Sequence, residues 1–323
     1  MDADCLFRKY WLSFLLCLLC ACDAMQAVVA AEKKDDKKPS AIDISAKLVL
    51  YLEFEQPTSE VALIEGVKVE CELYYRVPNR NEYRPKITRV VGTGFLLESQ
   101  VLHYVVTAKH LAKSSRSGRY WISPVDGEIA SGTFEEVQAK LPGARWFFHE
   151  YADIAVHPVL LPRGGKFKVM NKNTLSAEPP ELLTQVCIPG FPHTLGKDNV
   201  KLGPLVTRSE VASWPAILPN NPLTKVIFLN DRLAQGYSGA PVYSFRPPPS
   251  YGPFTKYTME IVGIQSGVYV FAGPGTGTLV TKDELSYIIP TSYLIDLLDS
   301  KDVQDFEKDL LTRIQQRKEK TQP

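Results

Sequence analysis

In the carboxyl-terminal half, the chain reads Gly236-Tyr237-Ser238-Gly239-Ala240-Pro241-Val242. Two glycines flank the serine, and glycine adopts the positive φ angles of a tight turn with little steric penalty. Such a turn directs the serine hydroxyl and the neighbouring main-chain N–H groups toward one point in space. The turn leads directly into Val242-Tyr243, which predicts the start of a β-strand. An ordinary Gly-Ser loop is the alternative interpretation.

Two segments nearer the amino terminus place ionisable residues beside apolar runs. His110 follows the apolar stretch 102–107, and Asp153 immediately precedes Ile154-Ala155-Val156. Because the desolvation of a buried carboxylate is costly, Asp153 requires a partner, and a histidine is a suitable one. Taken alone, His110 also fits a packing role and Asp153 fits a turn or capping role. The other histidines lack metal-ligand spacing, and we interpret them as surface or packing residues: His103, His149, His157 and His193.

From Lys47 onward the chain consists of short runs rich in Val, Ile, Tyr, Phe and Thr, with Gly and Pro between them. Such runs predict half-buried β-strands, and many short strands favour a sandwich or a barrel. The predicted strands include residues 48–54, 67–75, 87–97, 102–107, 154–158, 183–188, 226–229, 241–243, 259–265 and 287–289.

The carboxyl end has a different pattern. Apolar residues recur there at helical spacing, with charged and polar residues between them, at Val303, Phe306, Leu310 and Ile314. This spacing predicts an amphipathic helix that docks on the body of the protein. A helix that binds a partner is the alternative.

Composition narrows the class of protein. The 323 residues include 37 Lys and Arg and 36 Asp and Glu, so the net charge is +1. A balanced charge supplies no excess to hold a polyanion, and we expect no nucleic-acid partner. Outside the first 22 residues the cysteines are Cys71 and Cys187, which form neither a disulfide scaffold nor a zinc site. They either pair with each other or remain buried free thiols, and we expect no metal and no cofactor.

The amino terminus has the pattern of an export signal. Arg8 and Lys9 precede an apolar run, 10–22, which is short for a membrane span of about 20 apolar residues. Val29-Ala30-Ala31 offers a cleavage site. Two alternatives remain open: an uncleaved anchor helix, or lipid attachment at Cys22, because Leu19-Cys20-Ala21-Cys22 resembles a bacterial lipoprotein site.

The chain therefore divides into four segments. These are a signal peptide at 1–31, a charged linker at 32–46, a main domain at 47–298 and a helical tail at 299–323. Each version of the amino terminus places the main domain outside the cytoplasm, either periplasmic, secreted or anchored to a membrane.

The order His110, Asp153, Ser238 is the order of chymotrypsin-fold peptidases. With the segments around these residues, the chain resembles trypsin-like serine peptidases, especially the bacterial HtrA-like branch, without a PDZ domain. The resemblance extends over residues 67–298 and rests on segments 92–96, 105–110, 153–156, 236–242, 262–267 and 289–292. It implies two six-stranded antiparallel β-barrels, with His110 and Asp153 from the first barrel and Ser238 from the second.

The resemblance also implies a function, an exported serine endopeptidase that cleaves polypeptide substrates. Ser238 would be the nucleophile, His110 the general base and Asp153 the residue that orients the imidazole. The N–H groups of Gly236 and Ser238 would form the oxyanion hole. An inactive fold of the same kind that binds peptides or serves as a scaffold is the alternative.

Three further roles follow from the resemblance alone. Ser266 would hydrogen-bond Asp153, and Gly267 and Val268 would line an extended substrate strand. Arg232 would lie at the base of the side-chain pocket and favour acidic residues, or it would turn to solvent. Tyr237 stands where trypsins carry an Asp, so we expect no activation through an ion pair with a freed amino terminus.

Overall fold

A computed structural model describes residues 49–57, 59–64, 67–72, 74–76, 83–113, 115, 117–123, 129–162, 165–192, 203–219, 221–246, 258–272 and 282–321. The side chains of 59–72 and of most of 74–85 are not described. The predicted signal peptide, the charged linker, Cys22 and His193 lie outside these residues. Within the described ranges, no helix combines the length and the apolar character that a membrane span requires.

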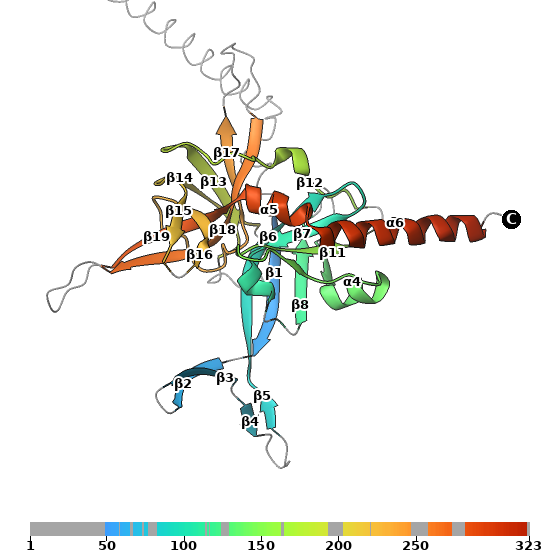
Figure 1. Cartoon of the computed structure of the whole chain (residues 1–323), viewed down its shortest axis with the longest axis horizontal. Helices are drawn as coiled ribbons and strands as arrows, with labels where there is room; N and C mark the ends of the chain where they lie inside the picture. Colours follow the sequence, from blue (N-terminus) through green and yellow to red (C-terminus); the bar gives the residue numbers. More distant parts are fainter. Residues whose placement is uncertain are drawn as a thin grey trace, which may run out of the picture. The chain divides into compact units, whose positions relative to one another are not determined.

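The first sheet is eight-stranded and is built around β6 (Figure 1). Strands β1 (Val49–Pro57) and β7 (His103–Thr107) flank β6 (Ile87–Glu98) in antiparallel register, and the short strand β12 (Met170–Asn171) pairs with β6 in parallel. The strand order is β10 (Phe147–Phe148), β11 (Ala155–Val159), β7 (His103–Thr107), β6 (Ile87–Glu98), β1 (Val49–Pro57), β8 (Ser117–Ile122) and β9 (Ala130–Thr133).

The second sheet is seven-stranded and antiparallel. Its order is β14 (Leu205–Glu210), β13 (Gln185–Gly190), β17 (Pro241–Arg246), β18 (Thr258–Ala272), β19 (Lys282–Pro290), β16 (Asn221–Phe228) and β15 (Ala216–Leu218). Two separate hairpins lie between β1 and β6 in the chain. They are β2 (Ser59–Ile64) with β3 (Val67–Glu72), and β4 (Tyr74–Arg76) with β5 (Tyr83–Pro85).

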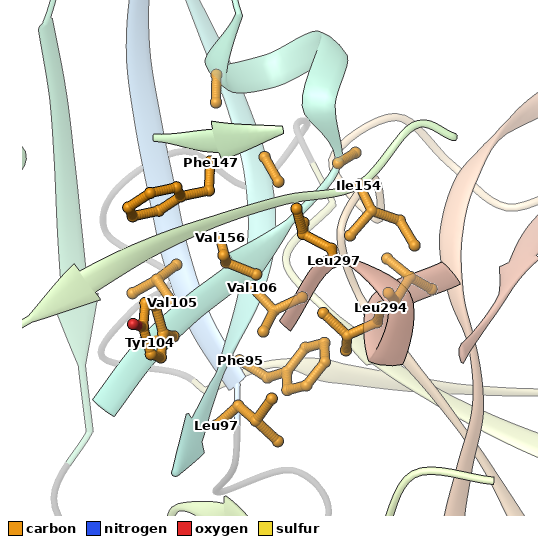
Figure 2. Close-up of a cluster of buried hydrophobic side chains, with 14 of the residues drawn as sticks. Phe95, Leu97, Tyr104, Val105, Val106, Phe147, Ile154, Val156, Leu294 and Leu297 are labelled. Carbon is orange, nitrogen blue, oxygen red and sulfur yellow. The ribbon is translucent and has the colours of Figure 1, made fainter. Parts of the chain in front are cut away.

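A continuous apolar core joins the first sheet to helix α5 (Thr291–Leu298). Figure 2 shows Phe95, Val106 and Val156 of the sheet facing Leu294 and Leu297 of the helix. All of these side chains are at most 4 % exposed. Since burial of each such side chain stabilises a fold by about 1.5–3 kcal/mol, this core fixes the strands that lead to His110 and Asp153.

Among the described residues neither strand order closes on itself, so the predicted six-stranded barrels are not found as closed barrels, and an eight-stranded and a seven-stranded sheet take their place. In the first sheet, helix α4 (Phe134–Lys140) packs against strands β8, β9 and β11. The Phe134 ring lies 4.7 Å from Trp146 and 4.8 Å from His157, centroid to centroid. Aromatic side chains therefore join helix α4 to Trp146 and to strand β11, which carries His157.

The helix predicted from the spacing at the carboxyl end is α6 (Lys301–Thr321). Its first turns dock as expected, because Val303, Phe306 and Leu310 are buried. Ile314, which belongs to the same predicted stripe, is 40 % exposed, so the packed part of the helix ends before it.

Most predicted strands are confirmed within a few residues, but 67–75 divides between two hairpins, as β3 and β4. The strands predicted above do not include β2, β5, β8, β9, β10, β12, β14 and β15, and helix α4 was not predicted either. Cys187 is a buried free cysteine, so for this residue the thiol alternative holds.

Candidate active site

Strand β6 is tied to the Ser238 turn by a single buried threonine. The Thr93 N–H donates to the Ser238 carbonyl oxygen at 2.8 Å, and the Thr93 hydroxyl donates to the Gly236 carbonyl oxygen at 2.8 Å. The same hydroxyl accepts from the Phe191 N–H at 3.0 Å. Thr93 is fully buried, and these bonds fix the turn of the second sheet against the first.

The turn requires glycine at position 239. Gly239 has φ +85°, a conformation in which a side chain is strained. A Cβ added there would lie 2.1 Å from the Thr93 oxygen and 2.2 Å from the Thr107 hydroxyl. The glycine therefore allows the turn to approach both strands of the first sheet that lead toward His110.

His110 and Asp153 form the pair that the sequence predicts. His110 lies in the short helix α3 (Lys109–Ala112), directly after β7, and Asp153 lies just before β11. The His110 N–H donates to Asp153 Oδ1 at 2.7 Å, and His110 Nδ1 lies 2.6 Å from Asp153 Oδ2. A carboxylate only accepts hydrogen bonds, so Nδ1 carries the proton and Nε2 is the basic nitrogen.

Ser266 completes the surroundings of the carboxylate. Its hydroxyl donates to Asp153 Oδ2 at 2.5 Å. Burial raises the pKa of the Asp153 carboxyl, but the hydrogen bonds from His110 and Ser266 and the interaction with the His110 ring lower it by more. The net direction is downward, so Asp153 is ionised at neutral pH.

Ser238 belongs to the same cluster through the main chain of Ser266. The Ser238 hydroxyl donates to the Ser266 carbonyl oxygen at 3.3 Å. No hydrogen bond joins this hydroxyl to the His110 imidazole, although both residues are among those described. The structure thus brings His110, Asp153 and Ser238 around Ser266, with the serine hydroxyl turned toward the Ser266 oxygen.

Two main-chain donors on the turn have no acceptor among the residues that the structure describes. They are the N–H groups of Gly236 and Ser238. The neighbouring Gly239 N–H, by contrast, donates to the Gln265 oxygen at 2.7 Å. The unpaired N–H groups are those of the two residues to which the resemblance assigns an oxyanion hole.

The predicted substrate-binding residues lie in different surroundings. Gly267 and Val268 lie on β18, which beyond Ile264 pairs only with β19 in the described part of the sheet. Val268 is 37 % exposed beside this open edge. Arg232 Nε lies 2.7 Å from Glu284 Oε2, and the Arg232 side chain is 68 % exposed. Its charge is therefore paired with a carboxylate of β19.

Two residues, Lys109 and His149, belong to the surroundings of the site but were not predicted from the sequence. The Lys109 Nζ donates to the carbonyl oxygens of His149 and Glu150, at 2.5 and 3.0 Å. These bonds tie helix α3, which carries His110, to the loop that carries Asp153. The position of Lys109 next to His110 in the sequence could have indicated this role, but the His149 carbonyl oxygen that Lys109 binds is 40 residues away in the chain.

The described residues contain no group of three or more His, Cys, Asp and Glu side chains arranged to hold a metal ion. His157 is fully buried, and burial lowers its pKa to about 4, in keeping with a packing role.

The chain matches no protein-family model and no curated protein.

Among solved structures, a variant of the HtrA-type protease AlgW with a decapeptide gives a TM-score of 0.48 at 14% identity, covering 78% of this chain and 62% of that one. A serine endoprotease from Yersinia pestis gives 0.44 at 15% identity, covering 83% and 69%. The MamO protease domain from Magnetospirillum magneticum gives 0.42 at 16% identity, covering 65% and 88%. This chain thus spans less than two thirds of the AlgW chain. In structure, it is similar to HtrA-type and other trypsin-like serine proteases.

Proposed function

We propose that this protein is a serine endopeptidase that uses Ser238 as nucleophile, His110 as general base and Asp153 as the residue that orients the base. The observation that carries the proposal is the set of hydrogen bonds on one carboxylate. Asp153 accepts from the His110 N–H, the His110 ring and the Ser266 hydroxyl, while the Ser266 oxygen accepts from Ser238. Such a carboxylate holds one tautomer of the imidazole and stabilises its cation.

The reaction begins when the Ser238 hydroxyl turns from the Ser266 oxygen to His110 Nε2. This step requires rotation about the serine Cα–Cβ bond, and catalytic hydrogen bonds are often incomplete in the free enzyme. Nε2 takes the hydroxyl proton as Oγ bonds to the carbonyl carbon of the substrate. The imidazolium then gives this proton to the leaving amine, and water attacks the acyl-enzyme by the same route.

The unpaired N–H groups of Gly236 and Ser238 support an oxyanion hole. Each such donor typically stabilises the transition state by about 2.7–4 kcal/mol. Thr93 binds the carbonyl oxygens of these same two residues, which holds the peptide group that follows each donor and so restrains the turn before substrate arrives.

The open edge of β18 supports a polypeptide substrate. An extended peptide adds to such an edge through main-chain hydrogen bonds, and Gly267 and Val268 lie where this strand would run. The Arg232–Glu284 ion pair favours the interpretation in which Arg232 does not select acidic residues, because its charge is already partnered.

Export to the periplasm or the medium is part of the proposal and rests on the apolar run 10–22 and the cleavage site at Ala31. A fusion of residues 1–48 to the amino terminus of a reporter protein that is active only outside the cytoplasm tests export. We expect an active reporter. Lipid attachment at Cys22 would be assigned if the fusion incorporates labelled fatty acid and Cys22→Ser abolishes this incorporation. A reporter that stays inactive contradicts export.

A peptide-binding protein without hydrolytic activity is the second candidate, favoured by the Ser238 hydroxyl pointing to Ser266 and not to His110. A fluorophosphonate probe separates the two. Labelling of the wild-type chain that Ser238→Ala abolishes, and that the exposed control Ser131→Ala retains, supports the peptidase. Folded wild-type protein that takes up no label supports the second candidate instead.

A further inference from the structure

The loop from His149 to Asp153 is held at both ends by main-chain bonds. The His149 N–H donates to the Ile154 oxygen at 3.0 Å, and the Ile154 N–H donates to the Ala152 oxygen at 2.9 Å. Asp153 occupies the last position of this loop. The conformation of the loop therefore helps to set the position of the carboxylate that His110 binds.

Inside the loop, the side chain of His149 replaces a main-chain acceptor. His149 Nδ1 accepts from the Tyr151 N–H at 3.2 Å and from the Ala152 N–H at 2.9 Å. Asn and Asp side chains often close a turn by accepting from N–H groups two or three residues further on. Here an imidazole nitrogen has this role, and an imidazole can be protonated near neutral pH.

Only the ring with an unprotonated Nδ1 serves as this acceptor. A protonated ring presents N–H at both nitrogens, so it would face two main-chain donors and repel them. The Tyr151 and Ala152 N–H groups would then lose their acceptor, and the turn that precedes Asp153 would open.

Groups from three elements face the His149 ring. Tyr293 of helix α5 contacts it edge-to-face, with 5.2 Å between centroids, and Asp296 lies on the same helix. Lys109 of helix α3 and Glu150 of the loop interact with the ring electrostatically, and the Tyr151 ring lies 6.4 Å from it, centroid to centroid. Burial lowers the pKa of His149; Asp296 and Glu150 act in the opposite direction, Lys109 adds to the lowering, and the net direction is downward.

Solvent reaches the ring through a cavity of about 350 Å³ that His149 lines together with residues of helices α5 and α6. The charged groups there are Glu150, Asp296, Lys301 and Asp302. His149 is half-buried, so a proton can be taken up from this cavity without unfolding of the core.

We propose that His149 is a positioning residue whose unprotonated ring holds the Asp153 loop in place, and that protonation of this ring releases the loop and misplaces Asp153. The effect on hydrolysis rests on the proposed function. The link between His149 protonation and the loop does not, because it concerns the fold of the free protein.

Two substitutions test the link without reference to activity. His149→Asn keeps an acceptor for the two N–H groups but does not titrate, and His149→Leu keeps similar bulk without an acceptor. A pKa that is lower in the folded protein than in the unfolded chain costs stability as pH falls below about 6.5, because the unfolded state then binds more protons. The Tm of the wild type should therefore fall more than that of His149→Asn between pH 7.5 and 5.5, by roughly 3 °C.

His103→Asn is the matched control, because it makes the same replacement on strand β7, outside this loop, and its Tm should follow the wild-type curve. Superimposable curves for wild type and His149→Asn would overturn the proposal. NMR gives a second test. The proposal would also be overturned if the His149 ring takes up its proton while the Tyr151 and Ala152 amide signals do not change.

Peptide hydrolysis tests the effect of His149 on activity. His149→Leu should lower kcat by about 10- to 100-fold with KM unchanged, since it misplaces a catalytic group without touching substrate. His149→Asn should restore kcat and give a shallower acid limb than the wild type. An Asn variant as slow as the Leu variant overturns the positioning role. If the wild type itself does not hydrolyse peptides, the proposed function fails, and the Tm curves alone decide the role of His149.

Discussion

The main-chain N–H of Thr93 donates a 2.8 Å hydrogen bond to the carbonyl oxygen of Ser238, a residue 145 positions further along the chain. Its hydroxyl makes a second bond to the same turn, at Gly236. One buried threonine in the first sheet thus controls the conformation of the turn in the second. The precision of the candidate site depends on this contact as much as on its chemical groups.

Thr93→Val preserves the shape of the side chain and removes the hydroxyl. The Gly236 oxygen and the Phe191 N–H then lose their partner in a buried place. We expect a loss of unfolding free energy of about 1–3 kcal/mol for each group left unpaired. Urea unfolding measures it, with the exposed Thr312→Val as control, and fluorophosphonate labelling should slow in parallel. Unchanged stability would contradict the assigned role of Thr93.

Gly239→Ala tests the close approach of the turn to the first sheet. Gly203 is a matched control, because it has φ +83° and nothing within 4 Å of an added Cβ, whereas Gly239 has φ +85° and contacts at 2.1 and 2.2 Å. Gly203→Ala should cost about 1–2 kcal/mol, from backbone strain alone. Gly239→Ala should cost clearly more and lower labelling of Ser238. Equal costs would mean that space at Gly239 is not limiting.

Asp153→Asn tests the orientation of the imidazole. An amide in place of the carboxylate can stabilise the wrong tautomer of His110, and in a Ser-His-Asp triad this lowers kcat by about 10⁴-fold. Hydrolysis of a peptide substrate measures the effect, with the exposed Asp305→Asn as control. A variant with nearly full activity would remove Asp153 from the mechanism.

The same variant gives a prediction on pH and stability. The pKa of Asp153 is lower in the folded protein than in the unfolded chain, so the carboxylate stabilises the fold above about pH 3.9. This contribution is lost as pH falls through the lower folded pKa. The difference in unfolding free energy between wild type and Asp153→Asn should therefore shrink from pH 7 to pH 3. A difference that is constant over this range would show that the carboxylate gains nothing from its partners.

Helix α6 offers a comparison of two residues of one predicted stripe. Phe306 is 7 % exposed and its ring contacts Phe147 at 5.4 Å, whereas Ile314 is 40 % exposed. Phe306→Ala should cost about 3–5 kcal/mol. Ile314→Ala should change the unfolding free energy by no more than about 0.5 kcal/mol. Denaturant unfolding of both variants checks the point at which the helix leaves the core.

The sequence by itself determined the strands with clear apolar patterns, the amphipathic spacing of α6, and the order of His110, Asp153 and Ser238. These features depend on neighbours within a few residues, and side-chain periodicity and glycine conformations are local properties of a chain. The tight turn at Gly239 is also a local feature, because it depends on a glycine that is read directly from the sequence.

Only the tertiary structure decided through which atoms and at what distances these groups meet. His110 and Asp153 are 43 positions apart and Ser266 and Asp153 are 113, so their contacts depend on the registers of different strands. The same holds for the Arg232–Glu284 pair, for the contact of Phe134 with Trp146, and for the bonds of Lys109 to the Asp153 loop. His149 had no distinguishing pattern, because an imidazole that closes a turn is recognised only when the positions of the N–H groups are known.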